Sequence, residues 1–170
     1  LNFNGAKAIG ITGKDASFMQ ARALENGKYG LVGEITHVRR SVIDDLVAQN
    51  FIPVIAPIAA GGINHPGFNV NADLAASEIA VALNAEKIIF LTDTTGILDK
   101  DKNLLSVLTQ EDIKALKRNG TIHGGMIPKT DACLASLQGG VKSAHIIDGR
   151  IEHSILLELF TNDGIGTNIK

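Results

Sequence analysis

Apolar residues follow two alternating patterns along this chain. Runs rich in β-branched and other apolar residues predict strands at residues 6–12, 29–38, 51–59, 87–92 and 141–147. Apolar residues at helical spacing predict helices at residues 41–49, 71–84, 109–119, 127–138 and 153–160. The run at 51–59 is apolar throughout, so we expect a strand buried on both faces. Glycines within 29–38 favour a hairpin arm or an edge strand.

Strands that alternate with helices are typical of an α/β fold. We therefore expect a three-layer αβα sandwich with a mainly parallel open sheet. Two helix starts carry local signals, because Asn71 suits an N-cap and residues 109–112 resemble a capping box. Ligands of such folds bind beyond the carboxyl ends of the strands. Asp93 directly follows the strand at 87–92, and we expect it at such a position.

Composition narrows the class of protein. The chain has 170 residues, 45% hydrophobic and 20% charged, as in globular proteins. A net charge of −2 and 4% aromatic residues argue against nucleic acid as a partner. Apolar runs stay shorter than the ~18 residues that a membrane span needs. The single cysteine, Cys133, excludes an intrachain disulfide, lies in a helical pattern and is expected to be a buried structural thiol. We expect a cytoplasmic protein.

The segment at residues 123–129 carries the clearest chemical signal. Gly124 and Gly125 allow backbone to approach a ligand closely, and Pro128 suits the first turn of a helix. A helix start after a glycine-rich turn favours anions, and Lys129 would add a positive charge there. The pattern indicates phosphate binding, although a solvated lysine after a loop would have the same sequence.

Two further polar segments have both a structural and a functional interpretation. Asn69, Asn71 and Asp73 precede or open a helix, where such residues often act as caps, but they could also converge on one ligand. The turn at residues 93–98 is either an Asx-type turn or one edge of a nucleotide site. The spacing of His, Cys and Asp does not suggest a zinc site, and we expect no metal bound by the protein itself.

The segments at 69–73, 91–98 and 124–129, in this order, resemble the amino acid kinase family. Residues 30–35 and 157–167 are similar to the members that phosphorylate N-acetyl-L-glutamate. The resemblance covers nearly the whole chain. It implies an amino acid kinase-like fold that is incomplete at the N-terminus. Residues 1–84 would be the remainder of the amino-acid-substrate lobe, and residues 85–170 the nucleotide-binding lobe.

This resemblance implies ATP-dependent phosphorylation of the side-chain carboxylate of N-acetyl-L-glutamate in arginine biosynthesis, by a homo-oligomer. Mg²⁺ would accompany ATP, held mainly by the nucleotide. Lys129 would contact the transferring phosphoryl group, Asp73 would organise the active-site lysines, and Asn69 with Asn71 would bind the acetylated amino acid. The implied nucleotide-binding residues are Asp93, Thr94, Thr95, Gly96, Ile97, Leu98, Thr121, Ile122, His123, Gly125, Met126 and Lys129.

Residues 153–167 resemble the arginine-inhibited branch of the family. The resemblance implies an effector site for L-arginine, a feedback inhibitor, that includes His153, Glu158 and Gly164. The alternative is an amphipathic terminal helix with an exposed acid.

The N-terminal part of the chain differs from the pattern of the family. The glycine-rich turn and the first phosphate-binding lysine of the family have no counterpart here, so we expect the chain to be an inactive fragment by itself. Another family member, of the glutamate 5-kinase, aspartokinase, carbamate kinase or uridylate kinase type, remains an alternative. A non-catalytic nucleotide-binding or regulatory module is a second alternative.

Overall fold

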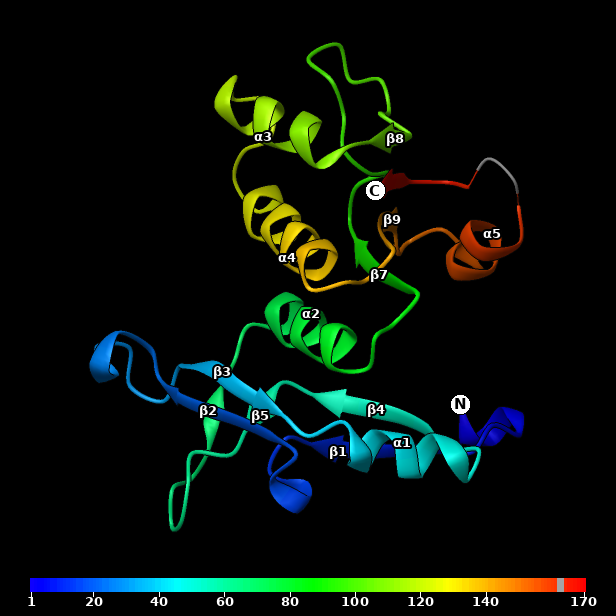
Figure 1. Cartoon of the computed structure of the whole chain (residues 1–170). Coiled ribbons are helices and arrows are strands. Elements are labelled where there is room, and N and C mark those ends of the chain that lie inside the picture. Colours follow the sequence, from blue (N-terminus) through cyan, green and yellow to red (C-terminus); the bar gives the residue numbers. More distant parts are fainter. Residues whose placement is uncertain (162–163) are drawn as a thin grey trace. The chain divides into compact units, whose positions relative to one another are not determined.

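A computed structural model describes residues 1–161 and 164–170. The chain forms two compact units, Leu1–Leu83 and Asn84–Lys170. Asn162 and Asp163 of the C-terminal segment that resembles the family lie outside the described residues. The first unit contains β1 (Ala8–Thr12), β2 (Met19–Ala23), β3 (Gly33–Val38), α1 (Ser41–Ala48), β4 (Ile52–Ala56), β5 (Ile58–Ala59), β6 (Phe68–Asn69) and α2 (Ala72–Ala82) (Figure 1). The second contains β7 (Lys87–Thr92), β8 (Val107–Leu108), α3 (Gln110–Arg118), α4 (Met126–Gln138), β9 (Ser143–Asp148), α5 (Ser154–Phe160) and β10 (Thr167–Ile169).

The first unit is built from short paired strands around a small core. β1 and β4 are parallel, whereas β2 pairs with β3 and β5 with β6 in antiparallel fashion. Phe18, Met19, Ile43 and Phe68 belong to the buried cluster between these elements. The side chain of Asn71 caps the start of α2, as the sequence predicts.

The second unit contains a four-stranded sheet in the order β7-β9-β10-β8. β7 runs parallel to β9, β10 antiparallel to β9, and β8 parallel to β10. Figure 1 shows α4 on one side of β7 and β9 and α5 on the other, which gives three layers. The predicted α/β class is therefore confirmed. Because β10 is antiparallel to β9, Thr167 at its amino end lies opposite Ile146, close to the carboxyl ends of β7 and β9.

The predicted strand at 29–38 is too long. Residues 29–31 form a turn, and β3 begins at Gly33. Its partner β2, Met19–Ala23, was missed because its sequence, Met-Gln-Ala-Arg-Ala, has no β-branched residue. The pairing depends on Phe18 and Met19 at the start of this segment, which are completely buried in the core.

The prediction of one buried strand at 51–59 is also wrong. The run divides at Pro57 into β4 and β5, which pair with different strands. Ile52 and Val54 of β4 remain 47% and 49% exposed. An apolar run by itself does not say which of its faces another element covers.

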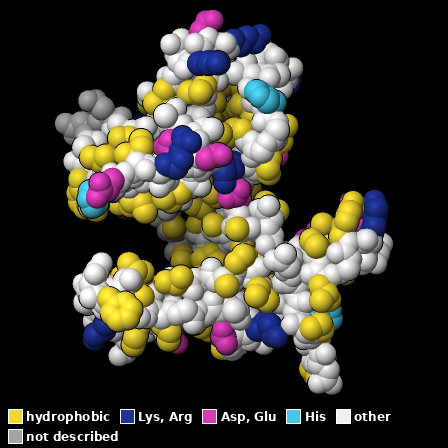
Figure 2. Space-filling model, turned by 180° about the vertical axis from the view of Figure 1, so that it is seen from behind, with side chains coloured by type: hydrophobic (Ala, Val, Ile, Leu, Met, Phe, Trp, Pro, Cys, Tyr) yellow, Lys and Arg dark blue, Asp and Glu magenta, His cyan; other side chains and the backbone are white. Residues whose placement is uncertain are grey.

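Apolar side chains also reach the surface elsewhere (Figure 2). On α5, Leu156 and Phe160 are 54% and 81% exposed. Cys133 of α4 is completely buried, as predicted. Among the residues described, no helix has the length and apolar character needed to cross a membrane.

Candidate functional site

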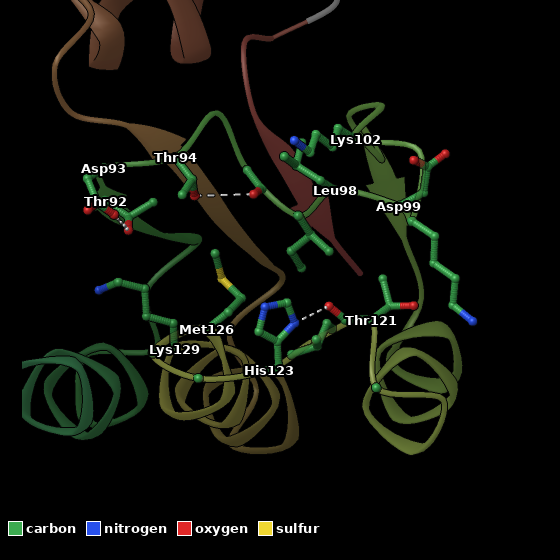
Figure 3. A pocket seen from close by; sticks show the side chains of 17 residues that line it. Thr92, Asp93, Thr94, Leu98, Asp99, Lys102, Thr121, His123, Met126 and Lys129 are labelled. Atoms are coloured by element: carbon green, nitrogen blue, oxygen red, sulfur yellow. Dashed lines mark hydrogen bonds between the residues drawn. The ribbon is translucent and has the colours of Figure 1, made fainter.

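A cavity of about 810 Å³ lies in the second unit, between the loop that follows β7 and the start of α4 (Figure 3). Its volume is in the range of ligand pockets. The cavity brings together the two segments that the sequence singled out, at 93–98 and 121–129. All the predicted nucleotide-binding residues except Thr95 line it: Asp93, Thr94, Gly96, Ile97, Leu98, Thr121, Ile122, His123, Gly125, Met126 and Lys129. Thr95 is exposed and does not line the cavity.

The carboxyl end of β7 forms one edge of this site, and the carboxyl end of β9 lies beside it in the sheet. Thr92 of β7 pairs with Asp148 of β9, and the Gly149 N–H donates to the Thr92 carbonyl oxygen at 2.8 Å. Asp148 is buried and accepts hydrogen bonds from the Arg150 side chain and backbone, which lower its pKa to about 2. The hydrogen bonds and charge of Asp148 raise the pKa of the Arg150 guanidinium, and the charge of Asp93, which follows β7, raises it further. This edge therefore keeps both its carboxylates close to a fixed cation.

The turn at residues 94–98 is held in shape from outside. The Ile97 N–H donates to the Thr167 hydroxyl oxygen at 2.8 Å, and the Ile97 carbonyl oxygen accepts from the Leu105 N–H at 2.9 Å. The Thr94 hydroxyl donates to the Gly96 carbonyl oxygen at 3.3 Å. Gly96 has a φ of 143°, a conformation that favours glycine. The sequence showed the turn but not its distant partner on β10.

The start of α4 forms the opposite wall. The N–H groups of Met126 and Ile127 donate back to the carbonyl oxygens of His123 and Gly124, so these two amides already have partners. A side chain atom added at Gly124 or Gly125 would meet no neighbour within 4 Å, which leaves room for a ligand at the backbone. The positive charge at this end of the helix therefore comes from Lys129, in the first turn, and from the helix dipole.

Figure 3 shows how the labelled side chains lie around the cavity. Met126 and His123 point upward from the α4 side, and Lys129 lies on the side of Thr92 and Asp93. The ring of His123 is oriented by a 3.0 Å contact between Nδ1 and the Thr121 carbonyl oxygen. Lys129 is half-buried. A ligand in the cavity would therefore meet Lys129 on the side of Thr92 and Asp93, and Met126 and His123 from the α4 side.

Five lining residues were missed by the sequence reasoning: Thr92, Asp99, Lys100, Lys102 and Gly120. Gly124, which the sequence indicated as a place where backbone can approach a ligand, also lines the cavity. Asp99 accepts the N–H groups of Asp101 and Asn103 at 2.8 Å each, and these bonds fold the loop back onto the cavity. Hydrogen bonds from Asn103, first from its backbone, lower the pKa of Asp99. The Asp-x-Asp-x-Asn pattern at 99–103 is the signal that could have indicated this loop.

The candidate residues of the first unit lie around the start of α2. Asn69 ends β6 and is exposed, with its N–H donating to the Leu31 carbonyl oxygen at 2.7 Å. Asn71 Oδ1 accepts the Leu74 N–H at 3.0 Å, so this side chain caps the helix. Asp73 is half-buried in the first turn. Capping accounts for Asn71, and the helix dipole favours an acid such as Asp73 in the first turn.

Glu158 on α5 is buried, which excludes the alternative of an exposed acid. Its carboxylate contacts His145 Nδ1 at 2.6 Å and accepts the Ile165 N–H at 2.7 Å. Burial by itself raises the pKa of Glu158, but these contacts outweigh it, and the pKa lies below its usual value. His145 was missed, although a histidine inside a predicted buried strand, directly before Ile146 and Ile147, is itself a signal for a buried partner.

Of the three predicted effector residues, Glu158 and Gly164 lie together, whereas His153 is exposed to solvent. Gly164 lies against Glu158, because an added Cβ would be 2.8 Å from Glu158 Oε2. His153 is exposed immediately before α5, and its Nε2 lies 3.5 Å from Glu152 Oε1. In the part of the chain that the structure covers, no three His, Cys, Asp or Glu side chains are grouped so that they could hold a metal.

Comparison with known proteins gives a consistent result. Residues 1–148 match the model of the amino acid kinase family. The chain is 63% identical over 170 residues to an acetylglutamate kinase of Sulfurimonas denitrificans, covering 99% of this chain and 60% of that protein. An acetylglutamate kinase of Nitratiruptor is 59% identical, with 99% and 60% covered. The chain thus spans about 60% of the length of these curated relatives.

A solved structure with a similar fold is N-acetylglutamate synthase from Neisseria gonorrhoeae, complexed with coenzyme A and L-arginine. It has a TM-score of 0.83 and 26% sequence identity, and the match covers 96% of this chain and 38% of that one.

Proposed function

Because this chain belongs to the amino acid kinase family, we propose that it acts in the ATP-dependent phosphorylation of the side-chain carboxylate of N-acetyl-L-glutamate. One observation carries the proposal. This chain is 63% identical to an acetylglutamate kinase, and a single cavity is lined both by the turn after β7 and by the start of α4, which contains Lys129. The activity would serve arginine biosynthesis, in the cytoplasm.

The roles of the two units follow from this proposal. The second unit binds ATP, with Lys129 contacting the transferring phosphoryl group and the turn at 93–98 holding the rest of the nucleotide. The first unit holds N-acetyl-L-glutamate through Asn69 and Asn71, and Asp73 orients active-site lysines. Mg²⁺ accompanies ATP and is held mainly by its phosphate oxygens. The complete enzyme is a homo-oligomer.

The residue types suit phosphoryl transfer to a carboxylate. The nucleophile is already ionised at neutral pH, so a general base is not needed. The chemistry instead requires positioning and neutralisation of the charge that spreads over the equatorial phosphoryl oxygens. Lys129 and the backbone around Gly124 and Gly125 are suited to that task. When bound, Mg²⁺ supplies further neutralisation of the same charge.

The test uses a completed enzyme, in which this chain is joined to the part of the Sulfurimonas denitrificans protein that it does not match. Hydroxylamine traps acyl phosphates, and release of ADP reports other acceptors. We expect N-acetyl-L-glutamate to exceed L-glutamate, L-aspartate, carbamate and uridylate by at least about 100-fold in kcat/KM. A different preferred acceptor would assign another activity within the family. Binding of an ATP analogue without turnover of any acceptor would indicate a non-catalytic module.

We also propose that Glu158 and Gly164 belong to a site for L-arginine, with His145 as an additional member and His153 at its rim. The support is the buried carboxylate of Glu158, with the backbone of Gly164 packed close to it, since a carboxylate is a group that accepts hydrogen bonds from a guanidinium. The bound arginine of the Neisseria synthase is a property of that protein.

Calorimetry with L-arginine tests this site. The Glu158→Gln variant keeps the shape of the side chain but loses its charge, and we expect it to bind arginine at least about tenfold more weakly than wild type. Glu111→Gln is the matched control, because Glu111 lies on α3, outside the proposed site, with a side chain 81% exposed. Equal affinity of wild type and Glu158→Gln would remove Glu158 from the proposed site.

A further inference from the structure

Thr167 lies at the junction between the C-terminal strand and the cavity. It is the first residue of β10, is completely buried, and lies at the sheet edge where β7 and β9 end. Its hydroxyl oxygen accepts the N–H of Ile97 at 2.8 Å, across 70 residues of sequence. Ile97 lines the cavity, whereas Thr167 does not. Thr167 can therefore act on a ligand only through the turn that it contacts.

The turn itself is packed directly against Thr167. A Cβ atom added at Gly96 would lie 2.7 Å from Thr167 Oγ1 and 3.1 Å from the Thr167 backbone nitrogen. The Ile97 carbonyl oxygen is fixed on its other side by the Leu105 N–H. Hydrogen bonds to residues outside the turn thus fix the orientation of the peptide groups on both sides of Ile97. Of the two partners, Thr167 belongs to a strand of the sheet.

The backbone leading into Thr167 is equally constrained. Glu158 accepts the Ile165 N–H at 2.7 Å, and a hydrogen bond from the Gly166 N–H also contributes to its low pKa. Gly166 passes so close to β9 that an added Cβ would lie 2.2 Å from the Ile146 carbonyl oxygen. Thr167 therefore has little freedom to move, and its hydroxyl is a fixed acceptor for the turn.

We propose that Thr167 is a positioning residue for nucleotide binding: its hydroxyl oxygen holds the Ile97 amide so that Gly96, Ile97 and Leu98 keep the shape that receives the nucleotide. This inference rests on the proposed function of the cavity. A buried N–H without an acceptor is rare in folded proteins. Without the hydroxyl, the turn would reorient to find another acceptor, and the cavity wall would change with it.

The experiment compares Thr167→Val, which keeps the shape but removes the hydroxyl, with Thr167→Ser, which keeps the hydroxyl. Thr167→Ala provides a smaller side chain if valine prevents folding. Ser136→Ala is the control, because it removes another completely buried hydroxyl of the second unit, one that donates to the Ala132 carbonyl oxygen away from the cavity lining. Affinity for the ATP analogue AMP-PNP is measured by calorimetry on the 170-residue chain, and exchange of the Ile97 amide hydrogen by NMR.

We expect Thr167→Val to accelerate exchange of the Ile97 amide and to raise the Kd for AMP-PNP about tenfold, as for loss of one buried hydrogen bond. Thr167→Ser and Ser136→Ala should stay within about twofold of wild type in Kd. Faster exchange at Ile97 with an unchanged Kd would overturn the inference, since Thr167 would then only stabilise the fold. A wild-type chain that does not bind AMP-PNP would instead contradict the proposed nucleotide site, and the inference with it.

Discussion

Replacement of Lys129 by methionine is expected to lower kcat of the completed enzyme by about 10²–10³-fold. Lys129 lies in the first turn of α4, is half-buried and lines the cavity on the side of Asp93. Methionine has a similar length and no charge, so the change removes the cation with little loss of packing. The affected quantity is the stabilisation of charge on the phosphoryl oxygens in the transition state. Steady-state kinetics with ATP and N-acetyl-L-glutamate measure it.

Lys142→Met is the matched control for this prediction. The Lys142 side chain is 76% exposed and pairs with Glu86 at 3.7 Å, outside the set that lines the cavity. We expect its kcat to stay within about twofold of wild type. If Lys129→Met retained the wild-type kcat and changed only the KM for ATP, Lys129 would be a ground-state binding residue and its catalytic role would be wrong.

Replacement of Gly166 by alanine is expected to lower the free energy of unfolding by about 3 kcal/mol. The added Cβ would lie 2.2 Å from the Ile146 carbonyl oxygen and 2.7 Å from Ile147 Cγ2. Both atoms belong to β9, which lies between β7 and β10 in the sheet, so the strand backbone must shift. Urea denaturation followed by circular dichroism measures the effect, since the chain has no tryptophan for fluorescence.

Gly125→Ala serves as the control for this substitution. Gly125 has a φ of −64°, and an added Cβ there would meet no atom within 4 Å. We expect its free energy of unfolding to remain within about 0.5 kcal/mol of wild type. A similar loss of stability in both variants would show that removal of glycine, and not the contact with β9, determines the effect.

Local signals in the sequence predicted the helices well. Asn71 caps α2, and Thr109 and Asp112 form the expected capping box at the start of α3. Such bonds join residues two or three positions apart, so the sequence itself contains both partners. The same holds for the turn after β7 and for the glycine-rich start of α4, whose residues the cavity now brings together.

Very short strands could not be predicted. β8 has two residues and β10 three, too few to show a pattern, and they are strands because β10 pairs with both β8 and β9. The exposure of Ile52 and Val54 could not be predicted either. An apolar run has the same sequence whether other elements cover one of its faces or both.

The sequence by itself determined the α/β class, the positions of the helices and the residue types suited to phosphoryl transfer, since periodicity, caps and glycine-rich turns act within a few positions. Only the tertiary structure decided that Glu158 is buried against His145 and that Thr167 holds Ile97, 70 residues away. Those contacts depend on where β10 enters the sheet. Strand order arises from the packing of the whole unit and leaves no local pattern in the sequence.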